Sequence, residues 1–161
     1  MRNKKEIIPF NFDVVYEDYQ YLYKQQDKKP FRTLQIQFLV SWIWNGENDK
    51  AQQVIGSTKE SWFLHKENDF KKTKNINRCH ITSQKKIVEK IFSKFHSKKE
   101  LYRYLSRYDK CILGTSKENM KKEAELLYIK FKPGYFRCQT VGYRHNKIDT
   151  EYLKSLMKKV A

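Results

Sequence analysis

Glycine and proline are scarce in this chain of 161 residues, which contains 5 Gly and 3 Pro. The glycines never reach the spacing of G-x-G-x-x-G or G-x-x-x-x-G-K-[ST], so the sequence has neither a dinucleotide-binding loop nor a P-loop. The prolines are isolated from one another, which excludes the Asp/Asn-Pro-Pro-aromatic motif of amino-methyltransferases. They are Pro9, Pro30 and Pro133. We therefore expect a protein that is not an enzyme and needs no cofactor.

Cysteine is also rare, and its pattern argues against both disulfides and metal. Cys79, Cys111 and Cys138 are odd in number and widely spaced, which favours reduced thiols in the cytosol or nucleus. Together with the histidines they form no C-x-x-C or H-x-x-x-H pair, the spacing on which structural zinc sites are usually built. We expect no metal site.

Long apolar runs are missing. The longest, Phe38 to Trp44, is interrupted by Ser41 and is far shorter than the roughly 20 residues that cross a bilayer. The basic residues after Met1 are not followed by the apolar segment of a secretory signal. We expect neither a membrane helix nor export.

Basic and aromatic residues are what the chain has in quantity. Lys and Arg number 34 against 18 Asp and Glu, a net charge of +16, and 15% of residues are aromatic. So many positive charges repel one another in a compact fold. A protein that keeps such an excess of positive charge usually binds a polyanionic partner. Nucleic acid is the first expectation, and an anionic membrane surface the second.

Hydrophobic periodicity predicts a mainly α-helical protein in four parts. Residues 1–29 form an aromatic arm that lies on a domain or on a partner, and 30–72 form a helix-turn-helix unit. A basic linker spans 73–81, and a second basic helical domain spans 82–161. The expected helices begin at Phe31, at about Asp49 and at Ser57. Further helices begin after Thr82-Ser83, at Ser97, at Thr115 and at Asp149, and a β-hairpin or wing lies at 135–143.

The segment 31–72 has the layout of a three-helix DNA-binding unit. A long helix precedes a short one that ends at Gly56, and a third begins at a Ser57–Glu60 capping box with Trp62-Phe63 in its middle. This stretch resembles the homeobox-like family, with the Myb/SANT group as its neighbour. The residues that carry the resemblance are Leu34, Phe38, Ala51, Val54, Ile55, Gly56 and 57–63.

The resemblance implies that the third helix lies in a major groove, with its base-reading positions at Ser61, Leu64, His65 and Asn68. The family's nearly universal asparagine corresponds to His65, and one of the two basic positions after it is Glu67. Sequence-specific reading is therefore less expected than general duplex binding.

Basic residues supply the remainder of the predicted nucleic-acid surface, with Tyr102, Tyr104 and Tyr108 interleaved for hydrogen bonds or stacking. The alternative is a set of solvated helix faces, which the net charge makes the weaker interpretation. The predicted contacts are Lys66, Lys71, Lys72, Lys85, Lys86, Lys90, Lys94, Lys98, Lys99, Arg103, Lys117, Lys121 and Lys122.

Abundant Lys, Asn, Gln and Tyr are typical of an AT-rich genome such as a ciliate's. Together with the homeobox-like unit, this makes the chain similar to the small accessory DNA-binding subunits of the ciliate DNA N6-adenine methyltransferase complex. The resemblance implies a nuclear, non-catalytic subunit that helps separate catalytic and accessory methyltransferase subunits to engage duplex DNA. Two alternatives stay open: an RNA-binding structural component of a ribonucleoprotein, and a protein-interaction subunit with an acidic partner.

Overall fold

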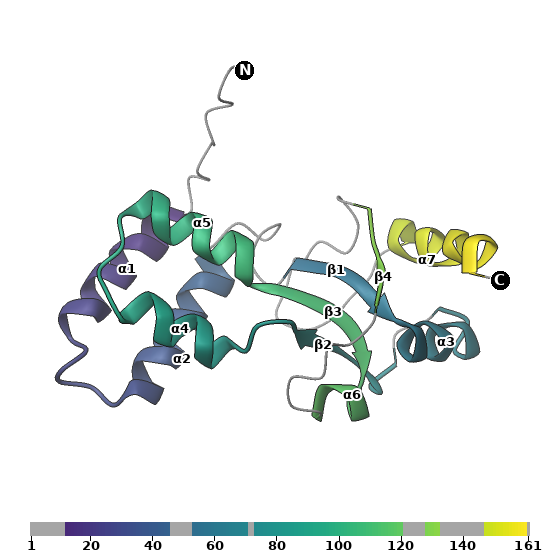
Figure 1. Cartoon of the computed structure of the whole chain (residues 1–161), viewed down its shortest axis with the longest axis horizontal. Helices are drawn as coiled ribbons and strands as arrows, with labels where there is room; N and C mark the ends of the chain where they lie inside the picture. The colour runs from purple at the N-terminus through teal and green to yellow at the C-terminus, as the bar shows by residue number, and fades with distance from the viewer. Residues whose placement is uncertain (1–11, 46–52, 71–72, 121–127, 133–146, 161) are drawn as a thin grey trace, which may run out of the picture.

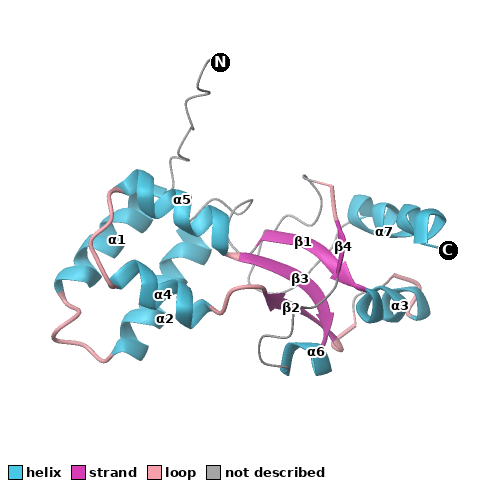
Figure 2. Cartoon of the chain, viewed as in Figure 1, coloured by secondary structure: helices cyan, strands magenta, loops and turns pink. Residues whose placement is uncertain are grey.

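The computed structural model describes residues 12–45, 53–70, 73–120, 128–132 and 147–160. Helices predominate, and a four-stranded sheet accompanies them (Figures 1 and 2). The helices are α1 (Phe12–Lys24), α2 (Phe31–Asn45), α3 (Lys59–Glu67), α4 (Gln84–Phe92), α5 (Lys98–Tyr108), α6 (Ser116–Met120) and α7 (Lys147–Val160). The strands are β1 (Gln53–Thr58), β2 (Ile76–His80), β3 (Lys110–Thr115) and β4 (Tyr128–Lys130).

Helices α1, α2, α4 and α5 surround one hydrophobic core at one end of the molecule (Figure 1). Its centre is aromatic: Phe12 meets the rings of Trp42 and Tyr102 edge-on, and Tyr19 contacts Phe38 in the same manner. Edge-to-face packing suits the ring quadrupoles and adds to the gain from burial. The aromatic residues of the N-terminal arm thus build the core of this half.

The sheet forms the second half, with the strand order β2-β3-β1-β4. β1 and β3 are parallel, whereas β2 and β4 pair antiparallel with β3 and β1 at the two edges. A second cluster packs here, with Trp62 from α3 and Leu153 from α7 against Cys111 and Leu113 of β3.

One buried polar contact joins the two halves. The indole Nε1 of Trp42 in α2 donates to Oδ2 of Asp109 over 2.6 Å, at the point where α5 passes into β3. Oδ1 of Asp109 lies 3.8 Å from Nε2 of His80 at the end of β2. Asp109 therefore contacts groups from both halves.

The prediction of a short helix that ends at Gly56 is wrong, because residues 53–58 form strand β1. A short apolar run such as Val54-Ile55 suits either state, and its long-range pairing with β3 decides the outcome. The sequence does contain a sign of this pairing. Residues 54–61, VIGSTKES, and 112–119, ILGTSKEN, are alike, and each forms a strand that passes directly into a helix.

Other expected elements also differ. Residues 12–24 of the expected arm form helix α1, and β2 lies inside the expected basic linker. The helix expected from Thr115 to Phe131 is wrong as a continuous element, because α6 ends at Met120 and 128–130 is strand β4. The remaining part of that helix and the hairpin expected at 135–143 lie outside the described residues.

The two cores do not follow the four predicted parts. The helical core takes α1 from the arm, α2 from the expected helix-turn-helix unit, and α4 and α5 from the second domain. The sheet core takes Trp62 of α3 from the unit and β3 from the second domain. Segments that are distant in the sequence associate to form each core. Hydrophobic periodicity does not predict which segments associate.

Candidate nucleic-acid interface

Helix α4 presents a basic face because its apolar residues all turn to one side. Ser83 caps the helix, its hydroxyl accepting from the amide of Lys86 over 3.2 Å. This is the cap that the sequence predicts. The buried side carries Ile87, Val88, Ile91 and Phe92, which face the helical core. The exposed side carries the predicted contacts Lys85, Lys86 and Lys90.

A buried tyrosine holds the connection between α4 and α5. The hydroxyl of Tyr19 donates to the carbonyls of Ile91 and Lys94, at 3.0 and 3.2 Å, and accepts from the amide of His96 at 3.0 Å. Its side chain is fully buried, and burial raises the pKa of Tyr19 to about 12. The tyrosine thereby positions the backbone that carries Lys94, whose side chain is exposed.

Helix α5 begins at the predicted capping box. The Ser97 amide and hydroxyl both donate to Glu100 Oε2 at 2.8 Å, and the Ser97 hydroxyl accepts from the Glu100 amide at 3.4 Å. These bonds lower the pKa of Glu100 and keep its carboxylate at the helix N-terminus. Leu101, Tyr102 and Leu105 are buried against the helical core.

The outer side of α5 is basic as well. Lys99, Arg103 and Arg107 follow one another at intervals of four residues, so they share a stripe, and all three are exposed. Arg107 is absent from the predicted set, although its spacing from Arg103 signals it. Lys98, a predicted nucleic-acid contact, is half-buried and forms an ion pair with Asp13 of α1. This ion pair links α5 to α1.

The face formed by α4, α5 and their connection is strongly positive. Residues 84–108 contain eight basic and two acidic side chains. Both acids already have partners: Glu89 pairs with Lys85 at 3.7 Å, and Glu100 caps α5. We call this surface the basic face. It consists of Lys85, Lys86, Lys90, Lys94, Lys99, Arg103 and Arg107.

The tyrosines interleaved in this segment serve the core more than the surface. Tyr102 is buried against Phe12, with ring centroids 5.1 Å apart. Tyr104 and Tyr108 are half-buried and pack on each other at 4.7 Å, and burial raises the pKa of Tyr104. The guanidinium of Arg107 lies 5.3 Å from the Tyr108 ring centre. An open row of rings for unpaired bases is not formed.

Two of the predicted base-reading residues in α3 are buried. Ser61 and His65 are both 0% exposed. The Ser61 amide donates to Thr58 Oγ1 at 3.1 Å, which makes Thr58, one residue after the expected Ser57, the helix cap. Nδ1 of His65 lies 3.0 Å from the Ser61 carbonyl oxygen. These side chains pack within the fold, so they are not placed to read bases in a DNA major groove.

The remaining predicted residues of α3 lie nearer the surface. Lys66 and Asn68 are exposed, and Leu64 is half-buried. Leu64 and Lys117 of α6 line one pocket of about 570 Å³, so the structure brings these two predicted contacts together. Glu60 and Glu67 line the same pocket, and their charge disfavours phosphate there. Lys71, Lys72, Lys121 and Lys122 lie outside the described residues.

The cysteines and histidines that the structure describes do not assemble a site. Cys79 of β2 and Cys111 of β3 are buried, and neither is in a disulfide. Burial, and second the nearby Glu118, raises the pKa of Cys79 to about 11, so its reactive thiolate is disfavoured. Within the described ranges, no group of three or more His, Cys, Asp or Glu side chains is placed to hold a metal ion.

Comparison of the chain with models of protein families, with curated proteins and with solved structures finds no match. Among the described residues, no helix is both long and apolar enough to cross a membrane.

Proposed function

We propose that this chain is a non-catalytic DNA-binding subunit that holds duplex DNA on the basic face of α4 and α5. The observation that carries the proposal is the density of exposed positive charge on two helices whose acidic side chains are already paired or capping. Lysine and arginine side chains on such a surface neutralise backbone phosphates, and these contacts position a duplex without reading its sequence.

The burial of the three interleaved tyrosines favours duplex over single-stranded nucleic acid, although Phe95 in the α4–α5 connection is 49% exposed. Proteins that bind unpaired bases stack them on exposed rings, whereas Tyr102 is in the core and Tyr104 and Tyr108 are half-buried. Competition between a duplex and single-stranded RNA of equal length distinguishes the two. We expect the duplex to win, and a preference for the RNA would support the ribonucleoprotein alternative.

The resemblance to homeobox-like accessory subunits extends the proposal to a nuclear DNA adenine-N6 methyltransferase complex. Segment 31–72 contains the long α2 and the capped α3, but β1 stands in place of the middle helix and the two helices belong to different cores, so the proposal rests on the sequence resemblance. In this proposal α3 contributes Lys66 and Asn68 to backbone contacts, and Ser61 and His65 serve packing. Affinity purification of the tagged chain from its native cells, followed by mass spectrometry, should recover a methyltransferase core. Recovery of ribosomal or spliceosomal proteins instead would contradict this assignment.

Two charge-matched triple variants test where the DNA lies. The first replaces Lys90, Lys99 and Arg103 of the basic face by Glu, and the second replaces Lys24, Lys28 and Arg32 of the α1–α2 hairpin, which are also exposed. The loss of about three phosphate contacts should weaken binding of a random 20-base-pair duplex at least tenfold in the first variant.

The control variant has the same net charge and should bind within about threefold of the wild type, because only the long-range field changes. Fluorescence anisotropy at 100 mM salt measures both. Equal weakening in the two variants would contradict the assignment of the contact to α4 and α5.

A further inference from the structure

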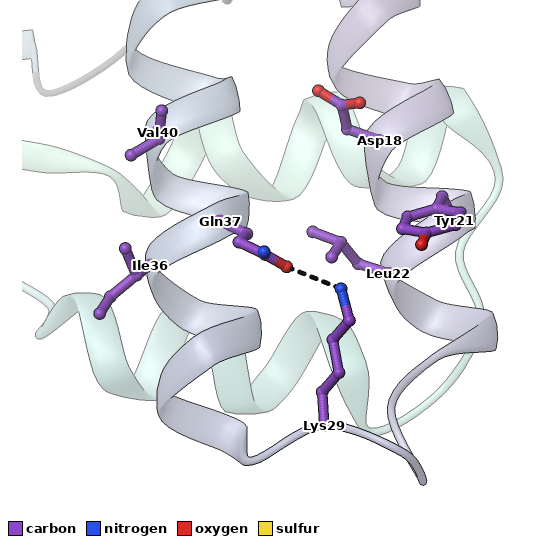
Figure 3. Close-up of a pocket in the computed structure, with 7 residues that line it drawn as sticks. All are labelled: Asp18, Tyr21, Leu22, Lys29, Ile36, Gln37 and Val40. Atoms are coloured by element: carbon purple, nitrogen blue, oxygen red, sulfur yellow. Dashed lines mark hydrogen bonds between the residues drawn. The ribbon is translucent and has the colours of Figure 1, made fainter.

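Helices α1 and α2 form an antiparallel hairpin with an outer groove of about 460 Å³ (Figure 3). Figure 3 shows α4 and α5 behind this hairpin, so the groove opens on the side opposite to them. The groove is lined by Asp18, Tyr21, Leu22, Lys29, Ile36, Gln37 and Val40. We propose that a second copy of this chain occupies the groove, and that the protein forms a two-fold symmetric dimer through the α1–α2 hairpin.

The composition of the outer surface supports a protein contact here. Tyr21, Ile36 and Val40 are 58%, 54% and 51% exposed, although each is a large apolar or aromatic side chain. Helix α2 has a single charged residue, Arg32, among its 15 residues, in a chain that is 32% charged. A solvated helix normally carries charge on its outer side, so an uncharged and partly aliphatic face is typical of an interface.

Charge identifies the second copy as the occupant. Residues 12–45 contain four acidic and four basic side chains, so the hairpin is neutral within a chain of +16. Two copies repel each other strongly through their basic faces. The hairpin is on the side away from α4 and α5, where two copies can approach with the least repulsion.

The groove is also self-complementary, which a two-fold contact requires. Asp18 lies at one end of the groove and Lys29 at the other, with Val40 level with Asp18 and Ile36 nearer to Lys29 (Figure 3). A two-fold axis that crosses both helices exchanges the two ends. It therefore places Val40 of each copy over Ile36 of the other, and Asp18 of each copy near Lys29 of the other.

Both charged groups keep capacity for a partner. Asp18 Oδ2 accepts from the Ser41 hydroxyl at 2.5 Å, and the second carboxylate oxygen can accept further bonds. The Lys29 ammonium donates to Gln37 Oε1 at 3.2 Å and lies 5.3 Å from the Tyr21 ring centre. These contacts hold the ammonium at the mouth of the groove, and it has two further protons to donate.

The size of the hairpin predicts a weak dimer. Two helices about 20 Å long and about 10 Å apart present a face on the order of 400 Å² per copy, below the roughly 800 Å² of a standard interface. We expect a dissociation constant in the micromolar range. Because salt screens the repulsion between copies, the dimer should form more readily at 300 mM than at 50 mM salt.

Sedimentation velocity of the full chain between about 5 and 300 μM tests the proposal. The wild type should pass from monomer to dimer over this range. Ile36→Glu and Val40→Glu should stay monomeric, and they should fold normally because both side chains are exposed. Ile81→Glu is the matched control: Ile81 is 50% exposed and lies outside the hairpin, so this variant should dimerise like the wild type.

A charge-exchange cycle makes the test specific for the two-fold geometry. Asp18→Lys and Lys29→Glu should each weaken the dimer, and the double variant should recover part of the loss because the pair is restored with reversed signs. Circular dichroism checks the fold of each variant. A wild type that is monomeric at 300 μM, or a dimer that Ile36→Glu and Val40→Glu leave intact, would overturn the proposal.

The dimer has a consequence that also depends on the proposed function. Two copies joined through their hairpins would direct their basic faces outward on opposite sides, so one dimer could bridge two duplex segments. A bead-bound duplex should then retain a second, labelled duplex with the wild type. Ile36→Glu should bind each duplex alone and retain no second one. If this variant fails to bind a single duplex, the fault lies with the proposed function; if it still bridges, the hairpin dimer is contradicted.

Discussion

Tyr19 links the core of the protein to its basic face. Its ring lies among aromatic neighbours from α2 and α4, and its hydroxyl forms hydrogen bonds with the backbone of the last turn of α4 and of the connection to α5. Hydrophobic periodicity identifies position 19 as a core position, but a phenylalanine would fit the same pattern. The sequence therefore does not predict a role for the hydroxyl group. The three backbone groups that it satisfies become visible only in the folded chain.

Replacing Tyr19 by Phe should lower the free energy of unfolding by about 1–3 kcal/mol, because the amide of His96 and two carbonyls lose a buried partner. Urea denaturation measures the change. Tyr21→Phe is the control, and it should change stability by less than about 0.5 kcal/mol because Tyr21 is 58% exposed. Equal effects in the two variants would show that the Tyr19 hydroxyl is not engaged.

His80 gives the fold a dependence on pH. Its pKa is lowered first by burial, an effect that Asp109 opposes and Arg78 reinforces. Below the ordinary histidine pKa of about 6.5, the unfolded chain therefore takes up a proton that the folded chain resists. Stability should fall as the pH drops from 7 to 5, and less so in His80→Gln. Between pH 7 and 8 the difference in the free energy of unfolding between the wild type and His80→Gln should stay constant. A difference that stays constant down to pH 5 would contradict this role of His80.

At the scale of elements, amphipathic helices are the part that the sequence predicts best. The spacing of Ile87, Val88 and Ile91 and the Ser97–Glu100 capping box identify α4 and α5 correctly, because the local pattern contains all the information needed. The same pattern correctly predicts that Lys85, Lys90 and Lys99 are exposed. Trp42 and Trp62 are both buried.

The sheet could not be predicted in this way, because each strand is short and finds its partner far along the chain. The burial of Ser61 and His65 follows from the same contacts: Ser61 Oγ lies 3.1 Å from Ser57 Oγ, at the end of β1. The likeness between 54–61 and 112–119 was the available signal. It marks two equivalent strand–helix junctions, whose strands lie side by side.

The second junction has a close contact that tests the pairing of β2 with β3. A Cβ atom on Gly114 would lie 2.5 Å from Sγ of Cys79 on the neighbouring strand. Gly114→Ala should therefore cost about 1–3 kcal/mol of stability through overpacking. Combining it with Cys79→Ala should remove that added cost, because the methyl group can occupy the space of the sulfur. Thermal denaturation of the four proteins provides the cycle, and strictly additive effects would show that the two positions do not touch.

At the scale of the whole molecule, charge divides the helical half into two sides. Residues 84–108 carry eight basic and two acidic residues, whereas the hairpin of α1 and α2 on the other side is neutral and partly apolar. Residues 84–108 thus contribute +6 of the net charge of +16, and the face proposed for contact between copies contributes none. The helical core, to which α1, α2, α4 and α5 all contribute buried side chains, lies between the two surfaces.

The salt dependence of duplex binding tests whether the basic face holds DNA through its phosphates. Seven basic side chains form the basic face, and neutralisation of about five phosphates predicts a slope of −4 to −5 for log K against log salt concentration. The measurement is fluorescence anisotropy of a random 20-base-pair duplex between 50 and 200 mM salt, at protein concentrations below those that favour the dimer. The account predicts this steep slope for the wild type and a shallower one for the Lys90, Lys99 and Arg103 triple variant. An affinity that stays flat across this range would contradict it.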